Sequence, residues 1–205
     1  AGLLDLGYVG FYAVGAYTVA LLTSPASPWN QTGPGGWLST DWAWLACLPI
    51  AIMITAISGL ILGSPTLRLR GDYLAIVTLG FGEIVRVFMN NLDRPVNITN
   101  GPKGLTGIDS LKLFGMDFGK TGNLFGMEIS SVTKYYYLFL LLVIASVIIC
   151  YRLEQSRIGR AWMAIREDEI AAKAMGINTR NLKLLAFGMG ATFGGVSGVM
   201  FATFQ

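Results

Sequence analysis

Histidine is absent from the sequence, and charged residues are scarce. Without histidine the chain lacks the commonest metal ligand and the usual side chain for relaying protons near neutral pH. Charged residues make up 13% of the 205 residues, about half the usual share for a soluble globular domain, whereas 53% are hydrophobic. A soluble protein of this size would need more charge on its surface, so we expect much of the surface to face lipid. The small net charge of +3 is spread along the chain and does not indicate a nucleic-acid partner.

Cysteine is also scarce, with one residue at Cys47 and one at Cys150. Each lies inside an apolar run, which predicts two small buried hydrophobic side chains and no disulfide framework. A starting methionine is missing, and both ends of the sequence lie in or beside apolar stretches. No basic region precedes the first of them, so no signal peptide is recognised there. We expect both ends to be cut from a longer protein.

Five apolar stretches have about the 20 residues that a helix needs to cross a hydrocarbon core of about 30 Å. They are residues 2–23, 43–63, 73–89, 135–151 and 182–204. The sequence therefore predicts an all-α fold, a polytopic bundle of about five transmembrane helices that forms a single transmembrane domain over residues 1–205.

Basic residues are distributed unevenly among the segments between these stretches. Residues 24–42 contain no Lys or Arg, residues 64–72 contain two, and residues 152–181 contain six. Because basic loops are retained on the cytoplasmic side, we expect residues 152–181 in the cytoplasm and residues 90–134 outside. The outer segment contains seven glycines separated by apolar residues, which favours a folded, partly re-entrant segment over a simple turn.

Glycine recurs at every fourth position of the last stretch, at Gly190, Gly194 and Gly198. This spacing places the three residues on one helix face, where another helix could approach closely. Close helix packing is the simpler interpretation, and a flexible gate is the alternative. In the third stretch, Glu83 and Arg86 also share a face. They either pair so that their charges are tolerated in the membrane or line a polar pathway.

The segment 165–176 predicts a short helix outside the membrane. Its acidic residues 167–169 suit the first turn, Ala171 and Ala172 are strong helix formers, and Gly176 is placed as the C-terminal cap. Such a helix could enter a groove on another protein or lie on the bilayer, and the residues alone leave both interpretations open. Three arginines would suit anionic lipid in the second case: Arg157, Arg160 and Arg166.

This segment resembles the cytoplasmic coupling loop of ABC importer permeases, because Ala171-Ala172 and Gly176 keep that loop's spacing. It departs from the pattern in that Ile170 takes the glutamate position and Glu169 is displaced by one residue. Three longer stretches resemble the permeases of branched-chain amino acid importers, in particular the LivM-type subunit. These stretches are residues 3–17, 65–86 and 157–178. Permeases for urea or short amides share the scaffold and remain an alternative.

The resemblance implies a transport subunit rather than an enzyme, in a multi-pass protein of the plasma (inner) membrane. It implies a second permease subunit, two ATP-binding subunits and an external solute-binding protein. No phosphate-binding P-loop occurs in the sequence. ATP and Mg are therefore expected on the partner ATPase, with no cofactor or metal in this chain. Contact with the ATPase would involve Ala171, Ala172 and Gly176, with Arg166 and Glu169 at the rim.

A leucine-like substrate is a zwitterion with an apolar tail, so its path needs polar and apolar surfaces. Candidate pathway residues are Tyr8, Tyr12, Thr78, Glu83 and Arg86. A competing hypothesis is a gradient-driven transporter in which Glu83 carries protons or ions. An intramembrane enzyme would need a nucleophile and a base, for which the spans offer no pattern.

Overall fold

The computed structural model describes residues 6–25, 27, 43–66, 72–93, 97–108, 110–113, 116–124 and 127–204. The described part is mainly helical. Its long helices are α1 (Tyr8–Thr23), α2 (Ala43–Thr66), α3 (Asp72–Asn91), α4 (Ser131–Glu154) and α7 (Thr179–Phe204). Helices α2, α3, α4 and α7 are long and apolar enough to cross a membrane, and α1 is a shorter apolar helix of 16 residues. The predicted all-α polytopic bundle is confirmed. Residues 2–5 of the first predicted span lie outside the described residues.

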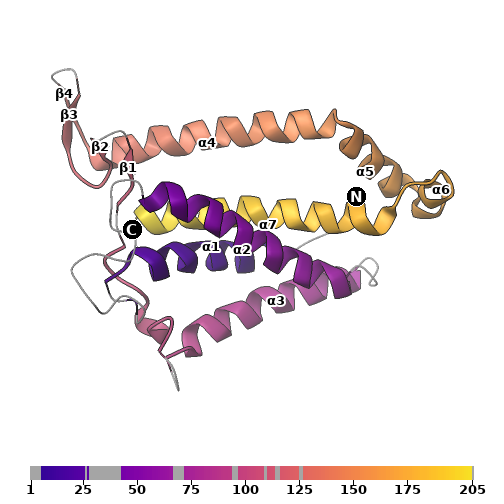
Figure 1. The fold of residues 1–205 in the computed structure, drawn as a ribbon, viewed down its shortest axis with the longest axis horizontal. Coiled ribbons are helices and arrows are strands. Elements are labelled where there is room, and N and C mark those ends of the chain that lie inside the picture. Colours follow the sequence, from indigo (N-terminus) through magenta and orange to yellow (C-terminus); the bar gives the residue numbers. More distant parts are fainter. Residues whose placement is uncertain are drawn as a thin grey trace.

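Helices α1, α2 and α7 form the packed centre of the bundle, and α3 lies against α1 (Figure 1). Glycines allow this close packing. A Cβ atom on Gly198 would overlap the backbone oxygen of Tyr12 in α1, and one on Gly15 would overlap the backbone of Gly195. On the α2 side, a Cβ on Gly59 would come within 2.6 Å of the Cβ of Ala191. Helix α7 is therefore held between α1 and α2 at backbone distance.

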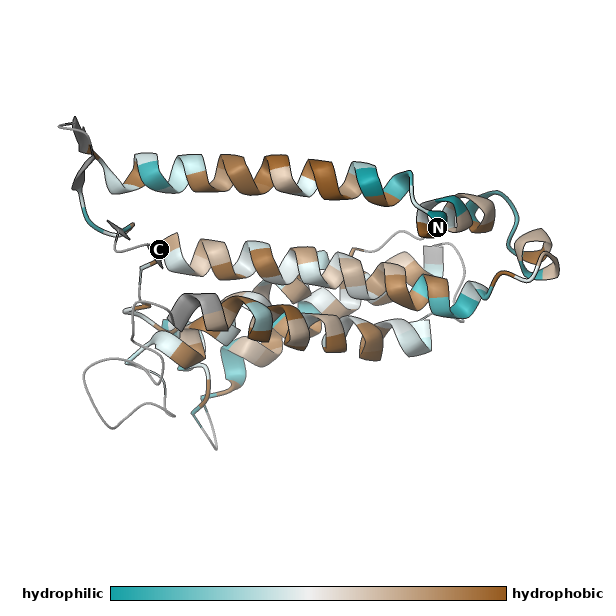
Figure 2. Ribbon diagram, turned by 45° about the horizontal axis from the view of Figure 1, so that its top comes forward, coloured by the Kyte–Doolittle hydropathy of each residue, from teal (hydrophilic) through white to brown (hydrophobic). Residues whose placement is uncertain are grey.

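Helix α4 lies apart from the other long helices for most of its length (Figures 1 and 2). It joins them at one end, where the Tyr135 hydroxyl donates to the carbonyl of Thr203 at 2.7 Å and accepts from the Leu111 N–H at 3.1 Å. The middle of the helix is apolar and exposed. The predicted burial is therefore right for Cys47 and wrong for Cys150, because no described helix of this chain covers α4 there.

One end of the bundle, here called the ribbon end, carries a 3₁₀ turn and two small antiparallel ribbons. The turn is η2 (Gly101–Lys103), and the ribbons pair β1 (Lys112–Leu113) with β2 (Met116–Asp117) and β3 (Gly122–Leu124) with β4 (Met127–Ile129). The sequence predicted a folded segment here but not its strands. Entry of this segment into the membrane remains a prediction.

The opposite end, here called the α6 end, carries the short helices α5 (Arg157–Glu167) and α6 (Glu169–Ala174) between α4 and α7 (Figure 1). Side chains cap the helix starts, as short polar residues do by accepting bonds from free backbone N–H groups. Ser156 accepts from the N–H of Gly159 at the start of α5, and Asp168 accepts from the N–H groups of Ile170 and Ala171 at the start of α6. These caps fix the breaks between consecutive helices.

The predicted short helix is present, with a later start than its acidic residues suggested. Glu167 ends α5 and Asp168 is the cap residue, so only Glu169 lies in the first turn of α6. Gly176 has φ +82°, and its N–H donates to Lys173 while the next N–H donates to Ala172. This pair of bonds is the Schellman pattern that ends a helix, and the left-handed backbone explains the glycine.

Candidate coupling and transport sites

Helix α6 presents an apolar surface that the rest of the described chain leaves uncovered. Ile170 is 76% exposed and Met175 is 83% exposed, and Ala171 is exposed beside them. Ala172 is only 4% exposed, and its helix packs against the chain's own α5 and α7. Of the two alanines predicted as contact residues, one is therefore exposed and the other is buried. Only Ala171 lies on the outer surface, together with two larger apolar residues that the sequence analysis did not single out.

The other face of α6 is tied to α7 by an ion pair. The Lys183 ammonium lies 2.7 Å from the Glu169 carboxylate, and the Lys183 side chain is only 10% exposed. A second bond joins α5 to α7, because the indole N–H of Trp162 donates to the Leu182 carbonyl at 2.8 Å. Both links reach the first turns of α7. These two bonds connect the α5–α6 segment to the central helix of the bundle.

The two remaining candidate coupling residues lie on the outside of the α6 end. Arg166 is exposed in the last turn of α5. Gly176 is exposed as well, and a Cβ atom there would meet no other atom within 4 Å. Its role in the structure is the helix-ending backbone conformation rather than room for a neighbour.

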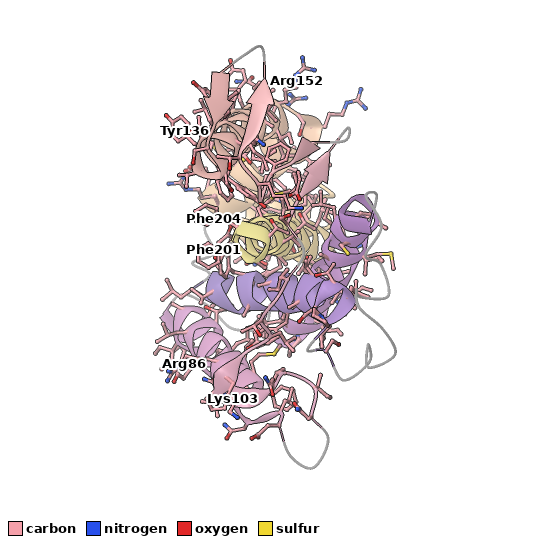
Figure 3. The ribbon with its side chains drawn as sticks, turned by 90° about the vertical axis from the view of Figure 1, so that its left-hand side faces the viewer. Arg86, Lys103, Tyr136, Arg152, Phe201 and Phe204 are labelled. Atoms are coloured by element: carbon pink, nitrogen blue, oxygen red, sulfur yellow. The ribbon has the colours of Figure 1, made fainter. Side chains whose placement is uncertain are left out.

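Glu83 and Arg86 bond to each other on the outward face of α3. The guanidinium Nε donates to both carboxylate oxygens, and Nη2 contacts Oε1. The two side chains are 58% and 68% exposed, and Figure 3 shows Arg86 pointing away from the bundle. Within the described residues this pair has no partner on another helix. The pair therefore faces away from the packed centre formed by α1, α2 and α7.

The other candidate pathway residues lie elsewhere. Thr78 is buried and accepts a bond from the Leu6 N–H at 3.0 Å, so it lies on the opposite face of α3 from Glu83. Tyr8 and Tyr12 face α7, where the Tyr8 hydroxyl is 3.3 Å from the Ser197 hydroxyl. The structure thus places these candidates in three separate regions and does not form one lining from them.

Only two of the three regularly spaced α7 glycines contact another described helix. Gly194 and Gly198 lie against α1, where a Cβ on Gly194 would be 3.0 Å from the Cβ of Phe11. A Cβ on Gly190 would meet nothing within 4 Å. The four-residue spacing does not include Gly195, whose Cβ would overlap the side chain of Thr55 in α2. Adjacent glycines thus serve two different helix contacts, which a search for every fourth residue does not detect.

Comparison with known proteins agrees with this arrangement of apolar helices. A family model described as "Branched-chain amino acid transport system / permease component" matches residues 1–205. The whole chain is 45% identical over 217 residues to the "High-affinity branched-chain amino acid transport system permease protein LivM" of Escherichia coli (strain K12) and 43% identical to the protein of the same name from Salmonella typhimurium. A "Probable branched-chain amino acid transport permease protein LivM" of Methanocaldococcus jannaschii is 27% identical over 78% of the chain.

The chain covers 47% of the length of the two bacterial relatives and 43% of the archaeal one, so it spans about half of each. No solved structure matches it significantly. The family match covers the whole chain, and the long apolar helices agree with it. The chain is thus a multi-pass membrane protein that belongs to the family of branched-chain amino acid transport system permease components.

Proposed function

We propose that the chain forms part of the membrane pathway of an ATP-driven importer for branched-chain amino acids. The observation that carries this proposal is the match of the whole chain to the permease family, together with the 45% and 43% identity to two LivM permeases. ATP hydrolysis belongs to separate ATP-binding subunits, and an external binding protein delivers the substrate. The membrane is the plasma (inner) membrane.

The distribution of basic residues supports an orientation for the bundle. Residues 152–181 carry six Lys and Arg residues and include α5 and α6. Since basic loops are retained in the cytoplasm, the α6 end lies inside and the ribbon end lies outside. This orientation puts α6 within reach of a cytoplasmic ATPase and places residues 97–129 where a binding protein would dock.

The exposed surface of Ile170, Ala171 and Met175 is the proposed contact with the ATPase. Large apolar residues exposed together are typical of protein interfaces, and a short helix fits a groove on a partner. Closure of the ATPase pair would move α6, and the Glu169–Lys183 and Trp162–Leu182 links would carry that movement into α7. Helix α7 would then move together with α1 and α2, because it packs against both at backbone distance.

The outward face of α3 is the proposed pathway surface of this chain. Ionisable residues at membrane depth usually face protein or water rather than lipid. The paired Glu83 and Arg86 are exposed in this chain, which supports a polar pathway between α3 and a second permease subunit. In this arrangement the Glu83–Arg86 ion pair contacts water or substrate along the pathway. The exposed apolar face of α4 contacts lipid or another protein.

Purification and uptake together test the proposal. The full-length protein that contains this chain is tagged and purified in mild detergent, and cells that express it are tested for uptake of labelled leucine. The proposal predicts a co-purifying ATP-binding protein and leucine uptake that stops on ATP depletion but survives collapse of the proton gradient. Uptake that collapses with the proton gradient alone would point to a gradient-driven transporter. Competition by urea or acetamide, without competition by valine, would point to an amide permease.

A further inference from the structure

A pocket of about 460 Å³ lies at the ribbon end, between α1, α7 and residues 104–108. Its volume is within the range of about 300–1,000 Å³ that small-molecule sites occupy. Helix α1 contributes several alanines together with Tyr12 and Tyr17, and α7 contributes Phe201. The coupling mechanism does not use this pocket.

The helical walls of the pocket suit an uncharged aliphatic group. Alanine side chains leave space along α1, and the rings of Tyr12 and Phe201 lie beside them with centroids 5.7 Å apart. Figure 3 shows Phe201 projecting from the end of α7 that carries this pocket. None of the described lining residues is Asp, Glu, Lys or Arg. A ligand with a charged side chain would therefore lack a countercharge, which makes its burial costly.

The third wall, residues 104–108, adds polar backbone groups to the side chains of Leu105 and Ile108. The Ser24 hydroxyl donates to the Thr106 carbonyl at 2.6 Å, and the Asn100 amide donates to the Gly104 carbonyl at 3.0 Å. Gly104 and Gly107 adopt φ values of +66° and +74°, which favour glycine. The backbone N–H groups of residues 105–108 donate no hydrogen bond to a backbone carbonyl of the described residues. A segment with backbone N–H groups that are unbonded within the described residues thus lies beside an apolar cavity.

We propose that this pocket binds the free branched-chain amino acid at the outer end of the bundle. The aliphatic side chain packs between the α1 alanines and Phe201, and backbone groups of residues 104–108 bind the carboxylate and the ammonium. The backbone is suited to both charges because it offers donors and acceptors side by side. This assignment rests on the proposed function, since it takes the imported substrate as the ligand and the ribbon end as the outer end.

Substitution of Leu105 tests the assignment through substrate preference. Leu105 lines the pocket from the loop side and belongs to no helix, so we expect Leu105→Trp to reduce the pocket volume. The full transporter with this variant should lose leucine uptake more than valine uptake, with the ratio of their KM values shifted by about tenfold, the discrimination that one methylene provides. Leu105→Ala should shift preference the opposite way, toward phenylalanine. Lys103→Trp is the control, because Lys103 is exposed in the same segment and does not line the pocket.

Protection from a thiol reagent gives a second measurement if Leu105→Trp fails to assemble. Leu105→Cys and Lys103→Cys are made in the full transporter with exposed Cys150 replaced by serine. Leucine at ten times its dissociation constant should slow labelling of Leu105→Cys by about tenfold, as simple occupancy requires. It should leave Lys103→Cys unchanged.

Unchanged substrate preference in the Leu105 variants, or equal labelling with and without leucine, would overturn the pocket assignment. Leucine uptake by the wild-type transporter distinguishes failure of the pocket assignment from failure of the proposed function. If it takes up leucine and the variants behave like wild type, only the pocket assignment fails. If the wild type takes up no branched-chain amino acid, the proposed function itself fails.

Discussion

Helices α4 and α7 are both long and apolar, yet they have opposite relations to the rest of the chain. Of the most apolar 18 residues of each helix, 44% are buried in α7 and none in α4. Helix α7 contains five glycines and α4 contains none. The more hydrophobic helix is α4, with a mean hydropathy of 2.2 against 1.6 for α7. Hydropathy thus indicates that a helix can cross a membrane, and glycine content indicates which helix packs inside the chain.

The difference follows from how helices associate in lipid. Burying an apolar side chain against another helix gains little there, because lipid tails are equally apolar, so close backbone approach and hydrogen bonds decide the packing. Helix α7 offers backbone surface at Gly194, Gly195 and Gly198. Helix α4 offers long aliphatic side chains, which fit lipid or a less intimate protein contact.

The largest expected effect comes from removing the backbone contact of α7. Gly198→Leu places a side chain where the backbone of Tyr12 lies, so α1 and α7 must separate. We expect destabilisation at or above the upper end of the usual overpacking range of about 1–3 kcal/mol. The measurement is the yield and thermal stability of the purified full-length protein in detergent.

Gly190→Leu is the matched control for Gly198→Leu, because a Cβ on Gly190 meets no atom within 4 Å. It lies on the same helix and introduces the same side chain. Equal loss of stable protein in both variants would contradict the assignment of the α1–α7 contact to Gly198.

A second prediction concerns α3, which is intermediate between the two helices, with 22% of its most apolar residues buried. Glu83→Ala should reduce leucine uptake per assembled transporter by at least about tenfold, equivalent to about 1.4 kcal/mol, because the variant removes a charge from the proposed pathway. Val87→Ala is the control, since Val87 is 48% exposed one helical turn away. Normal uptake by assembled Glu83→Ala protein would remove Glu83 from the pathway.

A third prediction extends the comparison to the link between α7 and α6. Lys183→Met removes the charged partner of Glu169. Hydrogen bonds to charged groups contribute about 1.5–3 kcal/mol, so moderate destabilisation is expected. The specific effect is on coupling, and leucine transported per ATP hydrolysed should fall by several-fold. The double variant Glu169→Lys with Lys183→Glu should recover part of that ratio. If Lys183→Met transports a normal amount of leucine per ATP, and the double variant does not improve on it, the Glu169–Lys183 ion pair does not transmit movement from α6 to α7.

The smallest effect is expected on α4. Val147→Ala shortens a side chain that is 62% exposed in this chain. Exposed substitutions usually change stability by about 0.5 kcal/mol or less. Thermal stability of the purified transporter should therefore remain close to that of the wild type. A loss as large as that of Gly198→Leu would mean that α4 packs tightly against protein in the assembled transporter.

Most of the helices could be predicted from the sequence because their hydropathy is strong and local. The spans at 43–63, 73–89 and 182–204 match α2, α3 and α7 to within three residues. The small ribbons could not be predicted, since strands of two or three residues have no periodic pattern. The sequence does not predict α5 as a separate helix. The break between α5 and α6 depends on Asp168 as the cap residue, and in the sequence Asp168 is not distinguishable from its acidic neighbours at 167 and 169.

The candidate sites were less predictable because side-chain direction depends on neighbouring elements. Ala171 and Ala172 look equivalent in sequence, yet one is exposed and the other is buried. Lys183 lies inside a predicted span and was not singled out. Its partner Glu169 lies 14 positions earlier on another helix. The sequence shows a lysine near the start of an apolar helix, which suggests a paired carboxylate but does not identify Glu169 as its partner.

Photo-crosslinking from α6 tests the central claim most directly. A photoreactive amino acid replaces Ile170, which is 76% exposed, and in a parallel sample replaces Ala172, which is 4% exposed. In membranes that contain the whole transporter, the Ile170 position should crosslink to an ATP-binding subunit, and the Ala172 position should crosslink only within its own chain. Crosslinking of the Ile170 position to lipid alone would contradict the claim that α6 couples this bundle to an ATPase.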